Sequence, residues 1–145
     1  MKIAIASDHA GFDLKEKLRE RLQNKHEIFD FGTYNTTSVD YPDFGFKAAE
    51  AVANGDFEYG ILICGAGVGM SITANKVKGI RAALCTNKDF ALLSRRHNNA
   101  NVLVLPGRFM SEHFAFDIAE TWLNEPFEGG RHQNRLNIIK QYEER

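Results

Sequence analysis

The chain has 145 residues, a length typical of one domain with its own core, and we expect a single domain over residues 1–145. Its 43% hydrophobic and 26% charged residues are ordinary for a globular protein, and a net charge of −1 gives no field that would favour nucleic acid or an acidic membrane surface. No apolar run reaches membrane-spanning length, and the two cysteines fall in predicted core strands, which fits a reducing compartment and predicts a cytoplasmic protein.

Strand-like and helix-like segments alternate along the whole chain. Short apolar runs predict strands at residues 3–6, 27–31, 60–63, 81–85 and 102–105. Apolar spacing, caps and glycine stops predict helices at about 13–24, 42–53, 71–76, 87–96, 111–124 and 131–145. Asp13 and Glu16 have capping-box spacing at the start of the first helix, and Ser111 is expected to cap the fifth. The alternation predicts an α/β, Rossmann-like fold of three layers, with a five-stranded parallel sheet and helices on both faces.

The most informative stretch is 59–72, where a predicted strand ends in a thiol and a glycine-rich turn opens a helix. Three alternating glycines let the backbone adopt positive φ and approach another molecule closely. The turn aims N–H groups and the positive end of a helix into the space where open α/β sheets bind ligands. It lacks the Gly-Lys-Ser/Thr of a P-loop, and its GxGxG spacing does not fit the dinucleotide fingerprint GxGxxG.

Cys64 directly follows the apolar run 60–63 and is expected to end that strand. A free cysteine is most often a small buried hydrophobe, and three glycines can simply make a tight turn. A thiol that faces backbone donors and a helix N-terminus, however, is expected to be reactive. The combination favours a chemical role for Cys64, whereas Cys85 has the pattern of a core residue.

Further polar residues follow or precede the predicted strands. Asp8 and His9 come after the first strand, Arg108 follows the fifth, and His97 with Asn98 lies between the fourth helix and the fifth strand. Each histidine alone is as compatible with a surface or core role as with a site. No spacing typical of metal ligands occurs among the five histidines, so no metal is expected.

Arg131 and Arg135 lie four residues apart at the start of the last predicted helix, and therefore share one face. A helix N-terminus prefers negative charge, so two cations there indicate an external anion, and guanidinium groups suit phosphate. The alternative is that both pair with Glu128 or with other carboxylates. A thiol base, backbone donors and a phosphate clamp, without metal or cofactor, suit proton abstraction next to a carbonyl.

These residues resemble the sugar-phosphate isomerase family of ribose-5-phosphate isomerase B, which also contains allose- and galactose-6-phosphate isomerases. The resemblance spans nearly the whole chain. Its matching segments are 7–12, 40–43, 63–72, 74–76, 79–82, 97–102 and 128–132. Together these motifs are highly specific, and the presence of Cys64 favours the ribose 5-phosphate branch over the galactose 6-phosphate branch.

The resemblance implies catalytic roles for three side chains and one turn. Cys64 would be the base that moves a proton between C2 and C1 of the sugar. His97, helped by Asp8, would open the furanose ring. The cis-enediolate would be held by backbone N–H groups of Gly65, Ala66, Gly67, Val68 and Gly69.

The resemblance also implies binding roles and an assembly. His9, Arg108, Arg131 and Arg135 match phosphate-binding positions, and Tyr41 and Asn98 match positions that line the sugar. The site would lie between two subunits, with the His97–Asn98 and Arg108 regions reaching the partner's Cys64. A homodimer is therefore implied, in some members paired into a tetramer.

Ala66 departs from the family pattern, which usually has Thr or Ser between the first two glycines of the turn. That hydroxyl is thought to carry a proton between the two substrate oxygens, and a methyl group cannot. The open alternatives are relay by water or by Ser71, a relay of little importance, or a different substrate.

The leading hypothesis is thus a cofactor-free aldose–ketose isomerase that interconverts ribose 5-phosphate and ribulose 5-phosphate in the pentose phosphate pathway. One alternative is an isomerase of a six-carbon sugar phosphate such as allose 6-phosphate. Another is a module that binds a phosphorylated metabolite without converting it, although such a module needs no thiolate base. Nucleic-acid binding is disfavoured, because no basic face with interleaved aromatic residues is present.

Overall fold

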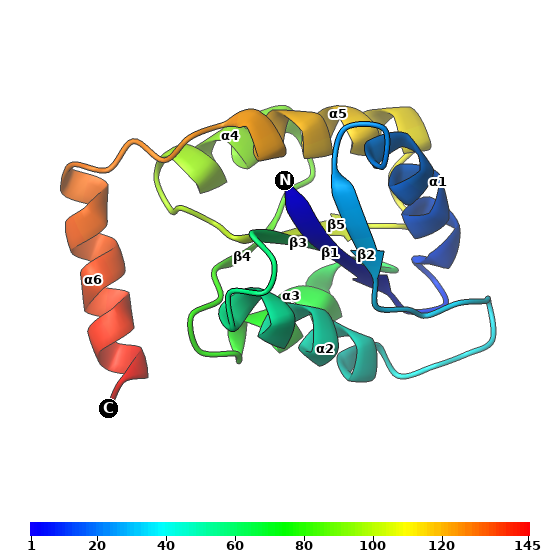
Figure 1. The fold of residues 1–145 in the computed structure, drawn as a ribbon, viewed down its shortest axis with the longest axis horizontal. Coiled ribbons are helices and arrows are strands. Elements are labelled where there is room, and N and C mark those ends of the chain that lie inside the picture. Colours follow the sequence, from blue (N-terminus) through cyan, green and yellow to red (C-terminus); the bar gives the residue numbers. More distant parts are fainter.

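A parallel sheet of five strands, in the order β2-β1-β3-β5-β4, forms the centre of the computed structural model, which describes residues 1–145 (Figure 1). The strands are β1 (Lys2–Ser7), β2 (Glu27–Asp30), β3 (Tyr59–Cys64), β4 (Ala82–Leu84) and β5 (Val102–Pro106). Strand β3 lies in the middle, and its register pairs Gly60 with Val102 and Cys64 with Pro106. The predicted α/β class and the five-stranded parallel sheet are confirmed.

Helices cover both faces of the sheet. One face carries α1 (Phe12–Leu22), α4 (Lys88–Arg96) and α5 (Glu112–Asn124), and the other carries α2 (Tyr41–Ala53) and α3 (Val68–Asn75) (Figure 1). Side chains of β3 alternate between the two cores, so that Ile61 and Ile63 face α1 and α5 while Leu62 and Cys64 face α2 and α3. The thiol therefore points to the α2–α3 side at the end of a fully buried strand.

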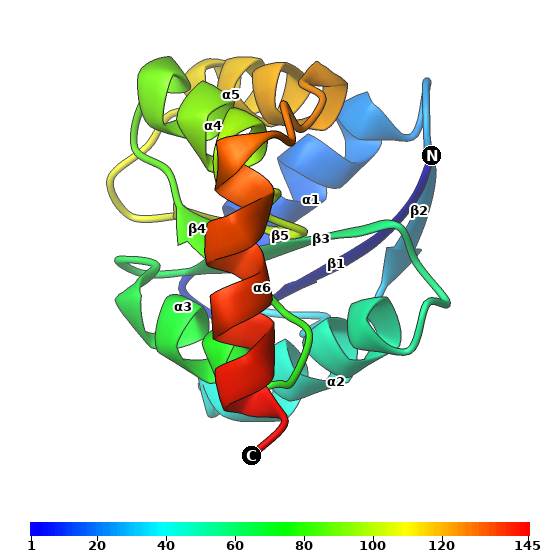
Figure 2. The same cartoon turned by 90° about the vertical axis from the view of Figure 1, so that its left-hand side faces the viewer.

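The last helix, α6 (Arg131–Glu143), stands beside the sheet rather than on a face of it. Figure 2 shows it running past the β4 edge, with the chain end pointing away from the body. His132 is its only buried residue, whereas Ile138, Ile139 and Tyr142 are exposed. Near its end, the Glu143 carboxylate accepts the Gly79 N–H at 3.0 Å. No helix of the structure is both long and apolar enough to cross a membrane.

Two predicted helix starts are corrected. Helix α1 begins at Phe12 with Gly11 at its N-cap position and no side-chain cap, so Asp13 lies inside the first turn instead of forming a capping box with Glu16, which pairs with Arg19. Helix α3 begins at Val68 rather than Ser71. The predicted Asn87 start and the Ser111 cap are confirmed, since each side chain accepts a backbone N–H of its helix.

Candidate active site

Three loops meet at the carboxyl edge of the sheet, after β1, β3 and β5. The Asp8 N–H donates to the Ile63 carbonyl at 3.3 Å, and the Gly107 N–H donates to the Cys64 carbonyl at 2.8 Å. The Arg108 N–H continues this pattern with the Gly65 carbonyl at 3.0 Å. Main-chain hydrogen bonds thus join the three loops around Cys64. Only 6% of the Cys64 surface is exposed. We call this group (Asp8, His9, Tyr41, Cys64, the turn 65–69 and Arg108) the thiol cluster.

The glycine turn owes its shape to Gly67, which has φ +80° and forms the N-cap of α3. This left-handed conformation suits glycine, and a Cβ at Gly67 would come within 2.5 Å of the Leu84 side chain. The N–H groups of Ala66 and Gly67 donate to no acceptor in the protein. Those of Val68 and Gly69 belong to the first turn of α3, where a helix supplies no acceptor. The turn therefore presents a row of free donors beside the thiol.

Other predicted site residues surround this turn. The Asp8 carboxylate is buried and accepts the Gly11 N–H at 3.0 Å. Tyr41 lies over the turn, because a Cβ added at Gly69 would be 2.6 Å from its ring. His9 is half-buried, and its Nδ1 accepts the Val39 N–H at 3.1 Å. Asp8 and Tyr41 thus lie beside the end of β3 and the glycine turn of the same chain, and His9 directly follows Asp8.

Arg108 also lies in the thiol cluster of its own chain, and its expected reach to a partner subunit stays a prediction. Its side chain lies 3.3 Å from the position of a Cβ at Gly65 of the same chain, and it is exposed. The reason is the short turn after β5, which places residues 107 and 108 directly beside the end of β3.

A second group forms at the C-terminal end of α4 and the start of α6. His97, Asn98, Arg131, His132 and Arg135 line one surface hollow. The His97 and His132 rings stack with centroids 4.2 Å apart and an angle of 15° between their planes. We call these five residues the histidine cluster.

The histidine cluster is arranged for an anion. Arg131 and Arg135 are exposed and form no ion pair, so the alternative that carboxylates neutralise them is not observed. The nearby Glu128 carboxylate instead lies 3.7 Å from His132 Nε2. Burial lowers the pKa of His132, and the neighbouring His97 and Arg131 lower it further. Two guanidinium groups without an ion-pair partner, beside the His132 imidazole, offer hydrogen-bond donors to a phosphate.

Ligand atoms of His97, Glu128 and His132 lie within 4.8 Å of one another, close enough for a metal ion. Sequence spacing gave no sign of this group, because α4 and α6 bring it together. The surrounding cations Arg131 and Arg135 make the electrostatic setting favourable to anions rather than to a divalent cation.

The two clusters lie at opposite ends of the strands in one chain. Residues 97–101 precede β5, and the Asn101 carbonyl accepts the Gly60 N–H at the start of β3. Cys64 is at the other end of β3, roughly 13 Å further along the strand direction at about 3.3 Å per residue. His97, which lies between α4 and the start of β5, is therefore toward the opposite end of the strands from Cys64 of its own chain.

Comparison with known proteins identifies the family of this chain. The family model described as "Ribose/Galactose Isomerase" matches residues 3–139. The chain belongs to the ribose/galactose isomerase family.

Relatives within the ribose/galactose isomerase family align with this chain over nearly their whole lengths. Ribose-5-phosphate isomerase B of Escherichia coli is 45% identical over 99% of this chain and 97% of its own. The solved structure of Clostridium thermocellum ribose-5-phosphate isomerase B, 52% identical, covers 99% of this chain and 98% of its own with a TM-score of 0.98. That of Mycoplasma genitalium, solved with bound ribulose-5-phosphate, is 46% identical with a TM-score of 0.94, covering 99% of this chain and 96% of its own.

Membership of the ribose/galactose isomerase family and the predicted fold are thus both confirmed. The predicted roles of individual site residues remain predictions. The sequence alone assigns no role to His132, although it lies within the matching segment 128–132 and four residues after Glu128. Its stacking on His97 depends on how α6 crosses the end of α4, which no local pattern indicates.

Proposed function

We propose that this protein is a cofactor-free isomerase that interconverts ribose 5-phosphate and ribulose 5-phosphate, with residues 1–145 as its single catalytic domain. The observation that carries the proposal is the buried thiol of Cys64 beside a turn whose N–H groups have no acceptor in the protein. The names of the relatives supply the substrate. A function in the pentose phosphate pathway of the cytoplasm follows from this substrate and the two free cysteines.

The reaction moves one proton between neighbouring carbons. The Cys64 thiolate takes the proton from C2 of the open-chain aldose and returns it to C1, passing through a cis-enediolate. Negative charge builds on the substrate oxygens during this transfer. The free donors of residues 65–69 stabilise that charge as an oxyanion hole does.

We further propose that the complete site is shared between two copies of the chain. The partner's histidine cluster would bring His97 to the thiol cluster, where Asp8 assists it in opening the furanose ring. His9, Arg108, Arg131 and Arg135 would hold the phosphate, and Tyr41 and Asn98 would line the sugar. Support comes from the separation of the clusters in one chain and from the exposed, scarcely packed α6. A homodimer is the minimum assembly, and pairs of dimers would form a tetramer.

The proton between the two substrate oxygens needs another carrier, because Ala66 has no hydroxyl. Ser71 lines a surface hollow with Ile72, Asn75 and Lys76, on the outer side of α3. This placement favours water over Ser71 as the carrier, and we propose a water relay.

One assay tests the proposal directly. Purified protein is given ribose 5-phosphate and allose 6-phosphate side by side, and formation of the ketose is followed. We expect clear preference for ribose 5-phosphate. Preference for allose 6-phosphate would support the six-carbon alternative, and binding of both without conversion would support a non-catalytic module.

A further inference from the structure

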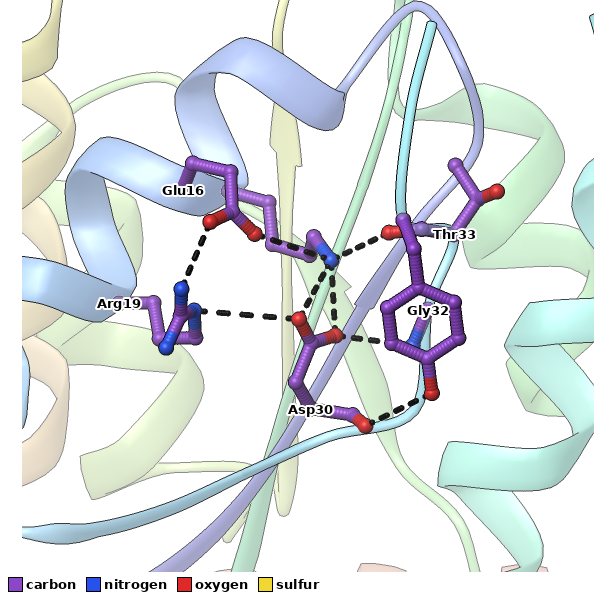
Figure 3. Close-up of polar contacts among 7 residues, drawn as sticks. Glu16, Arg19, Asp30, Gly32 and Thr33 are labelled. Atoms are coloured by element: carbon purple, nitrogen blue, oxygen red, sulfur yellow. Dashed lines mark hydrogen bonds and ion pairs between the residues drawn. The ribbon is translucent and has the colours of Figure 1, made fainter. Parts of the chain in front are cut away.

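A fully buried lysine lies outside both clusters. Lys15 on α1 has no exposed side-chain surface, and its ammonium donates to both carboxylate oxygens of Asp30, at 2.7 and 2.8 Å. It also donates to the Thr33 carbonyl at 2.5 Å and lies 3.4 Å from Glu16. Figure 3 shows these contacts, with Arg19 completing the group through Glu16 and Asp30.

The stability of the core does not require the buried Lys15–Asp30 ion pair. A buried charge is costly unless paired, and apolar residues of similar volume are often equally stable in place of a buried ion pair. The specific consequence of the Lys15 contacts is that they fix one segment of chain. Residues 31–40, which join β2 to α2 without helix or strand, begin directly after Asp30. The ammonium binds the Asp30 side chain directly before this segment and the Thr33 carbonyl oxygen within it.

The same segment is attached to the loop that carries two site residues. The Gly32 carbonyl accepts the Ser7 N–H at 2.7 Å, and the Thr33 N–H donates to the Ser7 carbonyl at 2.8 Å. The Gly32 N–H donates to Asp30 at 2.8 Å, so the carboxylate held by Lys15 also holds this turn. Ser7 is followed directly by Asp8 and His9 of the thiol cluster.

The far end of the segment acts on His9 itself. The Val39 N–H donates to His9 Nδ1 at 3.1 Å. A backbone N–H is always a donor, so Nδ1 must be the bare, accepting nitrogen. The hydrogen of the neutral ring then lies on Nε2. Two residues after Val39, the chain enters α2 at Tyr41.

We propose that Lys15 is a positioning residue: by clamping Asp30 and the Thr33 carbonyl it holds residues 31–40 so that Val39 fixes His9 in the Nε2–H tautomer and Tyr41 in place over the glycine turn. This rests on the proposed function for its kinetic effect but not for the tautomer. His9 would offer the substrate phosphate a directed donor, ready before the substrate arrives. Preorganisation of this kind lowers the cost of binding.

The first test measures the tautomer in the protein without any ligand. Histidine labelled with ¹⁵N distinguishes bare from protonated ring nitrogens by NMR, and the His9 signals are assigned by their loss in His9→Asn. We expect a bare Nδ1 and a protonated Nε2 in the natural protein, and a mixture of tautomers in Lys15→Met. A protonated Nδ1 in the natural protein, or an unchanged tautomer in Lys15→Met, would overturn the proposal. This readout stands even if ribose 5-phosphate is not the substrate.

The second test is kinetic and uses a matched control. Glu16→Gln alters a residue that touches the same ammonium but makes no contact with the segment 31–40. We expect Lys15→Met to lower kcat/KM for ribose 5-phosphate by roughly 10- to 100-fold, mainly through KM, because the phosphate donor and the sugar-lining ring are misplaced. Glu16→Gln should leave KM unchanged. Equal KM values for the two variants would show that Lys15 is merely structural.

Asp30→Asn provides a second route if Lys15→Met does not fold. Asparagine keeps the oxygen that accepts the Gly32 N–H but loses the charge that holds the ammonium. We expect the same rise in KM and the same mixture of tautomers. A folded Asp30→Asn protein with natural KM and a single His9 tautomer would overturn the proposal. Inactivity of the natural protein on ribose 5-phosphate would overturn the proposed function alone.

Discussion

The thiol cluster and the histidine cluster differ in what holds them in place. Around Cys64, three loops are bonded to each other through their main chains and extend from fully buried strands. The histidine cluster depends on α6, which buries a single residue of its own. The first cluster is therefore preorganised by the core of one chain, whereas the second presents cationic side chains on an element that is packed little against its own chain. Folding of a single chain therefore positions the thiol cluster, which is one of the two parts of the proposed site.

The largest effect is expected from the centre of the thiol cluster. Cys64→Ala should lower kcat by about 10²–10⁴-fold or more while binding remains near natural strength, because the base is lost and the phosphate contacts are kept. Isomerisation kinetics and substrate titration measure the two quantities. Cys85→Ala is the control, since this thiol lies in the core, where burial raises its pKa. More than about a tenth of the activity in Cys64→Ala would contradict the assignment.

Mixing subunits tests whether the two clusters meet across an interface. Cys64→Ala and His97→Ala chains, each inactive alone, should regain activity after subunit exchange, since a mixed dimer holds one site with both native residues. About half of the dimers would be mixed with one intact site each, so recovery approaches about a quarter of natural activity. Already opened substrate controls for an effect of His97 confined to ring opening. No recovery after verified exchange would place each site within one chain.

The anion affinity of the histidine cluster is tested at Arg131. Arg131→Ala should raise KM for ribose 5-phosphate about 10- to 100-fold, the usual worth of a hydrogen bond to a charged group. Free ribose should be a very poor substrate, because the phosphate supplies binding energy used at the reacting carbons. Gln133→Ala, an exposed change in the same helix that breaks only a contact with Asn137, is the matched control. Comparable kcat/KM for ribose and ribose 5-phosphate would exclude a phosphate clamp.

A smaller effect is expected at Ala66, which is exposed in the turn. Ala66→Thr should fold and retain or modestly raise activity on ribose 5-phosphate. If water is the relay, Ser71→Ala should have the same effect in the natural protein as in the Ala66→Thr variant. A larger loss in the natural protein would instead identify Ser71 as the carrier, because interacting sites are non-additive in a double-mutant cycle. An inactive but folded Ala66→Thr protein would indicate a turn reshaped for another substrate.

The smallest effect concerns the pH dependence of stability. Burial, with His97 and Arg131, lowers the pKa of His132 in the folded protein. As pH falls, His132 therefore takes up a proton in the unfolded chain before it does so in the folded protein. The stabilisation that comes from His132 is fully present above its ordinary pKa of about 6.5 and is lost as pH falls through the lowered pKa of the folded protein. His132→Gln should reduce the fall of Tm on acidification through this window. Equal slopes in natural protein and His132→Gln would refute the effect.

The sequence predicted the sheet and the thiol cluster because their determinants are local. Apolar runs define strands, and residues that follow parallel strands must meet at one edge, which brought Asp8, Cys64 and Arg108 together. Helix starts were less predictable where glycine replaces a side-chain cap: Gly11 and Gly67 begin α1 and α3 earlier than the polar pattern indicates.

The histidine cluster could be predicted only through the family resemblance. The shared face of Arg131 and Arg135 was visible as i and i+4 spacing, but the approach of His132 to His97 depends on tertiary placement of α6. The Lys15 contacts were equally hidden, because a lysine in an amphipathic helix normally reaches solvent. Nothing in its neighbours along the chain indicates that Asp30 and the Thr33 carbonyl lie beside it.

Helix α6 has a consequence for how this protein can change over generations. The residues that build both cores end at Leu123, before α6 begins, and α6 adds only His132 to the buried set. Substitutions on the exposed faces of α6 therefore leave the free energy of folding almost untouched and are filtered mainly by their effects on binding and association. New anion preferences and new assemblies can arise there without the destabilisation that changes around Cys64 would bring.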